Sequence, residues 1–198
     1  MDKSMTEKTS SSRQSARERL LAAATELFYE EGVQSVGIDK VIERAGVAKA
    51  SLYGNFEGKD DLVRAYLDAR RQARRAAIEA HVARHEEPRD KLLSVFDALA
   101  ESIAKPTYRG CAFLRASAEM PADASGRGVV RDARLWLRDL LSGFAKEAGA
   151  AKPKSLGRQL LMIYDGAAAS AQLDPEPGVA AAAKAAAQVL IEAACAKA

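Results

Sequence analysis

Two short segments bounded by glycines constrain the fold of this chain more than any other feature. The first is GIDKVIERAG at residues 37–46, and the second is VAKASLYGNF at residues 47–56. Apolar residues recur at helical spacing in both segments, and Gly46 between them suits a tight turn with a positive φ. The pattern predicts two short helices that meet at a steep angle, which is the geometry of a helix-turn-helix.

Longer helices are predicted on both sides of this unit. Residues 20–28 place apolar side chains on one helical face, with Ser12 or Ser15 as the cap. A long helix begins near Lys59, and proline and glycine residues then delimit further helices at roughly 89–104, 109–119, 127–148, 154–172 and 177–196. Alanine and leucine are abundant, and both favour helices. The sequence therefore predicts an all-α fold of about nine helices.

Composition excludes several classes of protein. The formal net charge is only +3 over 198 residues, so a nucleic-acid role must rest on a motif and not on charge. No run of about 18 apolar residues is present, so we expect no membrane partner. Cys111 and Cys195 are far apart in sequence and form no disulfide framework, which fits a reducing cytoplasm. Residues 1–12 are polar and serine-rich, and we expect them to be a disordered tail.

The sequence holds no recognisable enzyme, cofactor or metal constellation. Nucleophile elbows, phosphate-binding loops and dinucleotide fingerprints are missing. His81 and His85 have the i, i+4 spacing that can hold a metal, but neither the full HExxH pattern nor a third ligand accompanies them. We therefore expect no catalytic residue, no cofactor and no metal site.

The segment RERLLAAATELFYEEGVQSVGIDKVIERAGVAKASLYGNFEGKDDLV resembles the DNA-binding domain of the TetR family of bacterial transcriptional regulators. The matching elements are the LLAAATELF helix, Gly32, the ERAGV turn, the SLY tripeptide, Phe56 and Lys59. The later segments RGCAFLRASAEMP and RDARLWLRDLL resemble one subset of the C-terminal domains in that family.

This resemblance implies a division of the chain and a function. Residues 13–58 would be the helix-turn-helix DNA-binding domain, and residues 59–198 the effector-binding and dimerisation domain. The implied protein is a cytoplasmic homodimer, joined through its last two helices, that binds a palindromic operator in double-stranded DNA. By analogy with the family, we expect a repressor that is released by a small-molecule effector, although activation stays open.

Six residues are the predicted DNA contacts. On a helix over 49–56, Leu52 and Phe56 point inward, whereas the opposite face is small and uncharged at its centre. From the residues themselves we expect base or phosphate contacts from Lys49, Ala50 and Ser51. The resemblance adds three phosphate contacts: Tyr53, Asn55 and Lys59. The alternative is that both lysines are solvated and that Tyr53 packs its ring.

The chain departs from the family pattern at two helix starts. Gly37 and Ile38 stand where many members begin the second helix with Thr or Ser, and Ala48 stands at the start of the third. Neither Gly nor Ala offers a side-chain hydroxyl to a phosphate. Any phosphate contact at these two points must therefore come from the backbone.

The large side chains of the C-terminal half are predicted to be mostly core, with a subset lining an effector pocket. The candidates for this pocket are Phe96, Ile103, Cys111, Phe113, Trp136, Leu140, Met162 and Tyr164. Packing is the alternative for each of them. Cys111 is either an inert thiol or a redox- or electrophile-sensing one, which leaves a thiol-based regulator as an alternative function.

Other readings stay open at this point. The chain could be a helical ligand-binding protein that merely shares the N-terminal motif, or a helical adaptor. The cluster Arg70, Arg71, Arg74 and Arg75 could steer DNA or could pair with nearby acids on a solvated face. The alanine runs at 167–169, 180–183 and 185–187 would let helices approach closely in a dimeric four-helix bundle.

Overall fold

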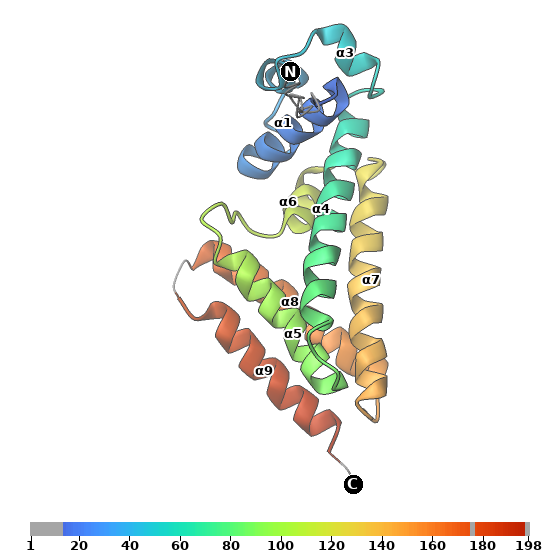
Figure 1. Ribbon diagram of the computed structural model, residues 1–198, viewed down its shortest axis with the longest axis vertical. Helices are drawn as coiled ribbons and strands as arrows, with labels where there is room; N and C mark the ends of the chain where they lie inside the picture. The colour runs from blue at the N-terminus through green and yellow to red at the C-terminus, as the bar shows by residue number, and fades with distance from the viewer. Residues whose placement is uncertain (1–13, 175–176, 197–198) are drawn as a thin grey trace, which may run out of the picture.

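The computed structural model describes residues 14–174 and 177–196, and these form nine helices (Figure 1). They are α1 (Ala16–Glu31), α2 (Ile38–Ala45), α3 (Lys49–Tyr53), α4 (Lys59–Val82), α5 (Pro88–Ile103), α6 (Ala112–Glu119), α7 (Gly126–Glu147), α8 (Pro153–Leu173) and α9 (Val179–Ala194). The predicted all-α fold is confirmed. The tail expected at residues 1–12 lies outside the described residues.

The helices fall into a small group at one end and a larger bundle. In Figure 1, α1, α2 and α3 gather around the N-terminal end of α4, while α4 and α7 run side by side along the molecule. Below them α5, α8 and α9 pack together, with α7 against α8 and α5 against α9. The short helix α6 lies beside α4, between the two groups.

The start of α1 follows directly from its sequence. The Ser15 hydroxyl accepts a hydrogen bond from the Glu18 amide, and the Glu18 carboxylate accepts one from the Ser15 amide. This reciprocal capping box satisfies two donors that the first turn would leave free. These hydrogen bonds from Ser15 hold the pKa of Glu18 below its ordinary value.

The turn between α2 and α3 has the expected geometry. Gly46 ends α2 with φ 59°, a left-handed conformation that favours glycine. Arg19 of α1 donates from Nε and Nη2 to the Ala45 carbonyl at 2.9 and 2.6 Å, and also donates to the Gly46 carbonyl. The last carbonyls of α2 are thus satisfied by a side chain from another helix, which fixes the turn on α1.

The predicted extent of the third helix was wrong. It ends at Tyr53 instead of Phe56, and Gly54 is its C-cap and not an interior residue. The amide of Asn55 bonds to the Leu52 carbonyl at 2.9 Å, while its side-chain Nδ2 donates to the Ser51 carbonyl at 2.7 Å. The Asn55 side chain therefore takes the acceptor that its own amide would use if the helix continued.

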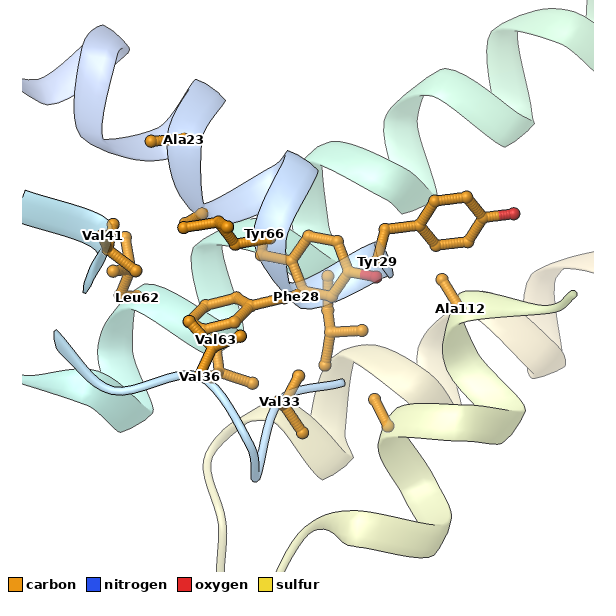
Figure 2. Packing of buried hydrophobic residues seen from close by; sticks show 14 of the residues in the cluster. Ala23, Phe28, Tyr29, Val33, Val36, Val41, Leu62, Val63, Tyr66 and Ala112 are labelled. Carbon is orange, nitrogen blue, oxygen red and sulfur yellow. The ribbon is translucent and has the colours of Figure 1, made fainter. Parts of the chain in front are cut away.

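Two hydrophobic clusters form the interior, and α4 contributes to both. The first holds the buried residues of α1, α2 and α3 together with Tyr66 and Leu67 of α4 and residues from α6 and α7. In it the rings of Phe28 and Tyr66 meet edge to face, with centroids 5.7 Å apart (Figure 2). The second holds Ile78 of α4 and the buried residues of α5, α7, α8 and α9. Packing therefore continues across the boundary expected at residue 58.

Tyr29 joins the end of α1 to the loop before α6. Its ring points away from Phe28 in Figure 2, and its hydroxyl donates to the Gly110 carbonyl at 2.9 Å. The same hydroxyl accepts from the Arg109 amide at 2.9 Å, and Arg115 donates to the Tyr29 carbonyl at 2.5 Å. The small helical group is thus hydrogen-bonded to a segment about 80 residues later in the chain.

Helices α7 and α8 approach each other at backbone distance. A Cβ placed on Gly157 of α8 would lie 2.9 Å from the backbone nitrogen of Ser142 in α7. On the same α7 helix, a Cβ on Gly143 would meet nothing within 4 Å. An added methyl group would therefore clash with the neighbouring helix at Gly157 and would fit without contact at Gly143.

We expect Gly157→Ala to lower the free energy of unfolding by about 1–3 kcal/mol, because the methyl group forces α7 and α8 apart. Gly143→Ala is the matched control and should raise stability by about 0.5–1 kcal/mol, since alanine is the better helix former. Urea unfolding at a fixed protein concentration measures both. Equal stability of the two variants would contradict the close approach at Gly157.

We expect Tyr29→Phe to lower the free energy of unfolding by about 1–3 kcal/mol, because the substitution leaves the Gly110 carbonyl and the Arg109 amide without their partner. The control is Tyr53→Phe, which removes the same hydroxyl from a side chain that is 57% exposed and should change stability little. Urea unfolding followed by circular dichroism compares the two. A Tyr29→Phe protein as stable as Tyr53→Phe would argue against this junction.

Candidate nucleic-acid interface and internal cavity

Helix α3 buries one side in the protein and exposes the other side to solvent. Leu52 is 0% and Phe56 3% exposed, and both pack into the first hydrophobic cluster. Ala50, Tyr53 and Asn55 are exposed on the outer side, and Ser51 is half-buried. In Figure 1 this helix forms the end of the molecule farthest from the C-terminus. The exposed face of α3 is short and carries mostly small side chains, so it could fit into the major groove of DNA.

The two lysines of the predicted set have partners within the protein. Lys49 Nζ lies 3.1 Å from Asp39 Oδ1 of α2, and this contact raises the pKa of Lys49 above its ordinary value. Lys59 Nζ donates to the Gln34 carbonyl at 3.2 Å. The Lys49 ammonium group therefore remains charged at neutral pH.

The first turns of α2 and α3 have no side-chain cap. Gly37 and Ala48 stand at their N-cap positions, and neither has a side chain that accepts a hydrogen bond from the helix. The free N–H groups of a helix start attract anions, as does the helix dipole. Backbone donors are therefore available at the two points where the sequence lacks a hydroxyl.

Two other basic side chains of the small helical group are paired with acids of α1. Lys40 Nζ lies 2.5 Å from a Glu31 carboxylate oxygen, and Arg44 pairs with Glu26. Together with the pair of Lys49 and Asp39, these contacts leave the surface close to electrical balance. Shape and a few placed groups, more than excess charge, must then account for any DNA recognition.

All four arginines of the α4 cluster have contacts within the protein, two with aromatic rings and two with acids of the same helix. Arg70 lies 3.9 Å above the Tyr29 ring and Arg74 lies 4.4 Å above the Phe113 ring. Arg71 pairs with Asp68 at 2.5 Å, and Arg75 pairs with Glu79 at 2.7 Å. The pairs of Arg71 and Arg75 favour pairing with nearby acids on a solvated face over DNA steering, whereas Arg70 and Arg74 lie against aromatic rings.

A cavity of about 200 Å³ lies between α4, α5, α8 and the segment that leads into α6. Its wall includes Tyr29 of α1, so the small helical group takes part in enclosing it. Aromatic and aliphatic side chains form much of the wall, and several polar groups point to it: Arg70, Arg74, Glu101, Lys105, Tyr108 and Tyr164. Such a lining is typical of a small-molecule site.

The structure brings only part of the predicted pocket set together. Cys111, Phe113 and Tyr164 line the cavity. Phe96 is buried behind it, with its ring 6.2 Å from that of Tyr164. The remaining candidates lie elsewhere: Ile103, Trp136 and Leu140 pack against the second hydrophobic cluster, and Met162 is 64% exposed.

Sequence reasoning missed the polar side of the cavity. Arg70, Arg74, Tyr29 and Tyr108 line it but were not among the predicted pocket residues. The available signal was the spacing of Arg70 and Arg74, which places two cations on one face of a helix that packs against apolar neighbours. Arginine on a helix is usually solvated, so the spacing alone did not show whether these side chains line a cavity or lie on the exposed face of the helix.

A second hollow of about 390 Å³ lies between the loop after α1, the start of α4 and the loop before α7. Its wall includes Gln34, Lys59 and Asp60, close to the proposed DNA contacts. It lies at the edge of the small helical group and not among the helices of the bundle. We therefore treat the first cavity as the small-molecule site.

Two further expectations concern metals and membranes. His81 Nε2 lies 2.9 Å from Glu101 Oε2, and within residues 14–174 and 177–196 no three metal-ligating side chains come together. Over the same ranges, every helix falls short of the length and hydropathy that a membrane span needs.

Comparisons with known proteins agree with this arrangement. Residues 20–66 match the family described as bacterial regulatory proteins, tetR family. A TetR-family transcriptional regulator from Streptomyces coelicolor superposes with a TM-score of 0.86 at 36% identity, covering 91% of this chain and 90% of that one. Its likeness extends over both helical groups.

Curated relatives match over shorter stretches. The regulator SrpR of Pseudomonas putida is 33% identical over 66 residues, which are 33% of this chain and 31% of SrpR. The transcriptional activator FasR of Mycolicibacterium smegmatis is 42% identical over 55 residues, 28% of this chain and 25% of FasR. These matches thus span about a third or less of the relatives' length. Together with the full-length structural match, they show that the chain belongs to the TetR family of transcriptional regulators, which are not enzymes, and carries its helix-turn-helix DNA-binding domain.

Proposed function

We propose that this protein is a cytoplasmic repressor that leaves a palindromic operator when a small molecule enters the internal cavity. The observation that carries this proposal is the position of Tyr29, which belongs to the helix-turn-helix group and also lines the cavity. On this proposal, residues 13–58 bind DNA, and residues 59–198 bind the effector and the second subunit.

Six residues are proposed to contact DNA. Lys49, Ala50 and Ser51 face the bases and nearby phosphates from the start of α3. Tyr53, Asn55 and Lys59 contact phosphates, as their match to the family pattern implies. Asp39 must release Lys49 on binding, because the ammonium group cannot serve both partners fully.

The dimer is proposed to form through α8 and α9. Both helices expose large apolar side chains: Met162 is 64% and Leu173 76% exposed on α8, and Val189 is 64% exposed on α9. Exposed apolar side chains on two helices in contact favour association. Two copies joined here would place their α3 helices in successive major grooves, about 34–36 Å apart.

The effector acts through its different affinities for two positions of the helix-turn-helix group. Tyr29, Arg109 and Gly110 connect that group to the loop around the cavity. A ligand that binds better when these contacts are shifted moves the two α3 helices away from the operator spacing. FasR is named as an activator, so activation stays an alternative to repression for this chain.

A second candidate is regulation through the thiol of Cys111. This side chain lines the same cavity and is a free thiol that packs against both hydrophobic clusters. Covalent modification would fill space that an effector would occupy. Loss of operator binding after treatment with N-ethylmaleimide, abolished by Cys111→Ser, would support this candidate over a reversible effector.

We expect Tyr53→Ala to weaken operator binding about 10-fold, or about 1.4 kcal/mol, without lowering the melting temperature. Lys49→Met should reduce the slope of log affinity against log salt by about 1, because one phosphate contact is lost. Fluorescence anisotropy with a duplex selected from genomic DNA measures both.

Lys146→Met is the matched control for this experiment. Lys146 is an exposed lysine in the last turn of α7, at the opposite end of the bundle from α3. It should bind DNA as the wild type does. Unchanged binding by Tyr53→Ala, or no binding by the wild type at any ionic strength, would refute the proposed interface.

We expect Val189→Asp and Met162→Asp each to convert the dimer to a monomer, because an unpaired carboxylate buried in an apolar interface costs several kcal/mol. Light scattering after size exclusion measures the molecular mass. Leu114→Asp is the control, since Leu114 is also an exposed apolar residue, 43% exposed, but lies on α6. A dimer that survives both substitutions would place the interface elsewhere.

A further inference from the structure

The cavity between α4, α5 and α8 has an excess of positive charge. Arg70, Arg74 and Lys105 line it, against one carboxylate, Glu101. Glu101 already has a partner in His81, whose contact holds the pKa of that carboxyl below its ordinary value. Within the described part of the chain, none of the three cations forms an ion pair.

Arg74 has a donor that the protein leaves unused. Its guanidinium lies on the Phe113 ring, and Nη2 donates to the Ala133 carbonyl at 2.8 Å. Its Nε is buried and has no acceptor among the described residues. Buried donors almost always have a partner, and leaving one unpaired is costly. An acceptor brought by a ligand would satisfy this N–H.

Tyr164 presents a second donor to the same cavity. Burial raises the pKa of Tyr164 to about 12, so the phenol keeps its proton at neutral pH. The other two tyrosines of the wall use their hydroxyls within the protein, since Tyr108 donates to the Ala168 carbonyl at 2.8 Å and Tyr29 to that of Gly110. The phenol of Tyr164 can therefore donate to a ligand and can also accept from one, whereas the Nε of Arg74 can only donate.

Much of the remaining wall is apolar, and the volume is small. Ile78, Leu99 and Phe113 are among the buried residues that line it, and the cavity holds about 200 Å³. An apolar cavity of roughly 150 Å³ is enough for benzene. The space therefore suits one ring, or a chain of similar size, with one polar group.

We propose that the effector is a small monocarboxylate with an apolar body of about one ring, whose carboxylate pairs with Arg74. This inference rests on the proposed function only in treating the cavity as the effector site. The apolar body lies against Ile78, Leu99 and Phe113, while Tyr164 donates to the carboxylate or to a second oxygen of the ligand. Arg70 adds positive potential from the Tyr29 side.

The test compares acids with their neutral amides on the full-length protein. Benzoate, phenylacetate and hexanoate are titrated beside benzamide, phenylacetamide and hexanamide, by calorimetry and by the shift in melting temperature. At least one acid should bind roughly 10- to 100-fold tighter than its amide, because a hydrogen-bonded ion pair is lost in the amide. Equal binding of every acid and its amide, or no binding by any acid, would overturn the proposal.

Arg74→Met should reduce the affinity for that acid by roughly 10- to 100-fold and leave the amide unaffected. Arg71→Met is the matched control on the same helix, because Arg71 pairs with Asp68 and does not line the cavity. Tyr164→Phe provides a second variant if Arg74→Met fails to fold, and should weaken acid binding several-fold. Acid binding that both cavity variants retain at full strength would also overturn the proposal.

Operator binding is measured on the same samples, so that a failure of the carboxylate proposal can be distinguished from a failure of the proposed regulatory function. A wild-type protein that binds duplex DNA but no carboxylate refutes the carboxylate inference and leaves the regulatory function intact. A protein that binds an acid through Arg74 but never binds DNA keeps the carboxylate site and refutes the proposed function.

Discussion

A single helix, α4, is built into both hydrophobic clusters, and the coupling between the two ends of the molecule depends on it. Tyr66 and Leu67 anchor it among the helix-turn-helix residues, whereas Ile78 anchors it in the bundle. Each fully buried side chain of this size contributes about 1.5–3 kcal/mol, so α4 cannot detach locally at low cost. A change of its tilt beside the cavity must therefore move the DNA-binding end.

The Tyr29 junction supplies the second connection, and it differs from α4 in kind. It consists of hydrogen bonds to the backbone of Arg109 and Gly110, which lie in the loop around the cavity. Hydrogen bonds break and form over short displacements, whereas packed helices slide as units. The helix α4 thus holds the two parts together, and on the proposed function the Tyr29 hydrogen bonds would change when a ligand enters the cavity.

Much of the fold could be predicted because its determinants are local. Apolar spacing, the Ser15 cap and the glycine turn at Gly46 depend on neighbours within a few residues. The end of α3 was missed because an Asn55 side chain competes with its own backbone amide, a choice that spacing does not reveal. The cavity wall was predicted only in part. Packing between helices that are distant in sequence decides that Arg74 lines the cavity and that Met162 is exposed to solvent.

The acid partners of Lys40, Arg44 and Lys49 have a consequence for how the protein finds its site. Adsorption to arbitrary chromosomal sequence is driven by cations that displace counterions from phosphates, and these three cations already have acid partners. In the proposed dimer, this pairing would shorten the time spent on the millions of wrong positions that compete for it. If Lys49 contacts DNA as proposed, only a sequence whose groove accepts α3 closely enough to separate Lys49 from Asp39 would retain the protein, so these carboxylates would sharpen the genomic search.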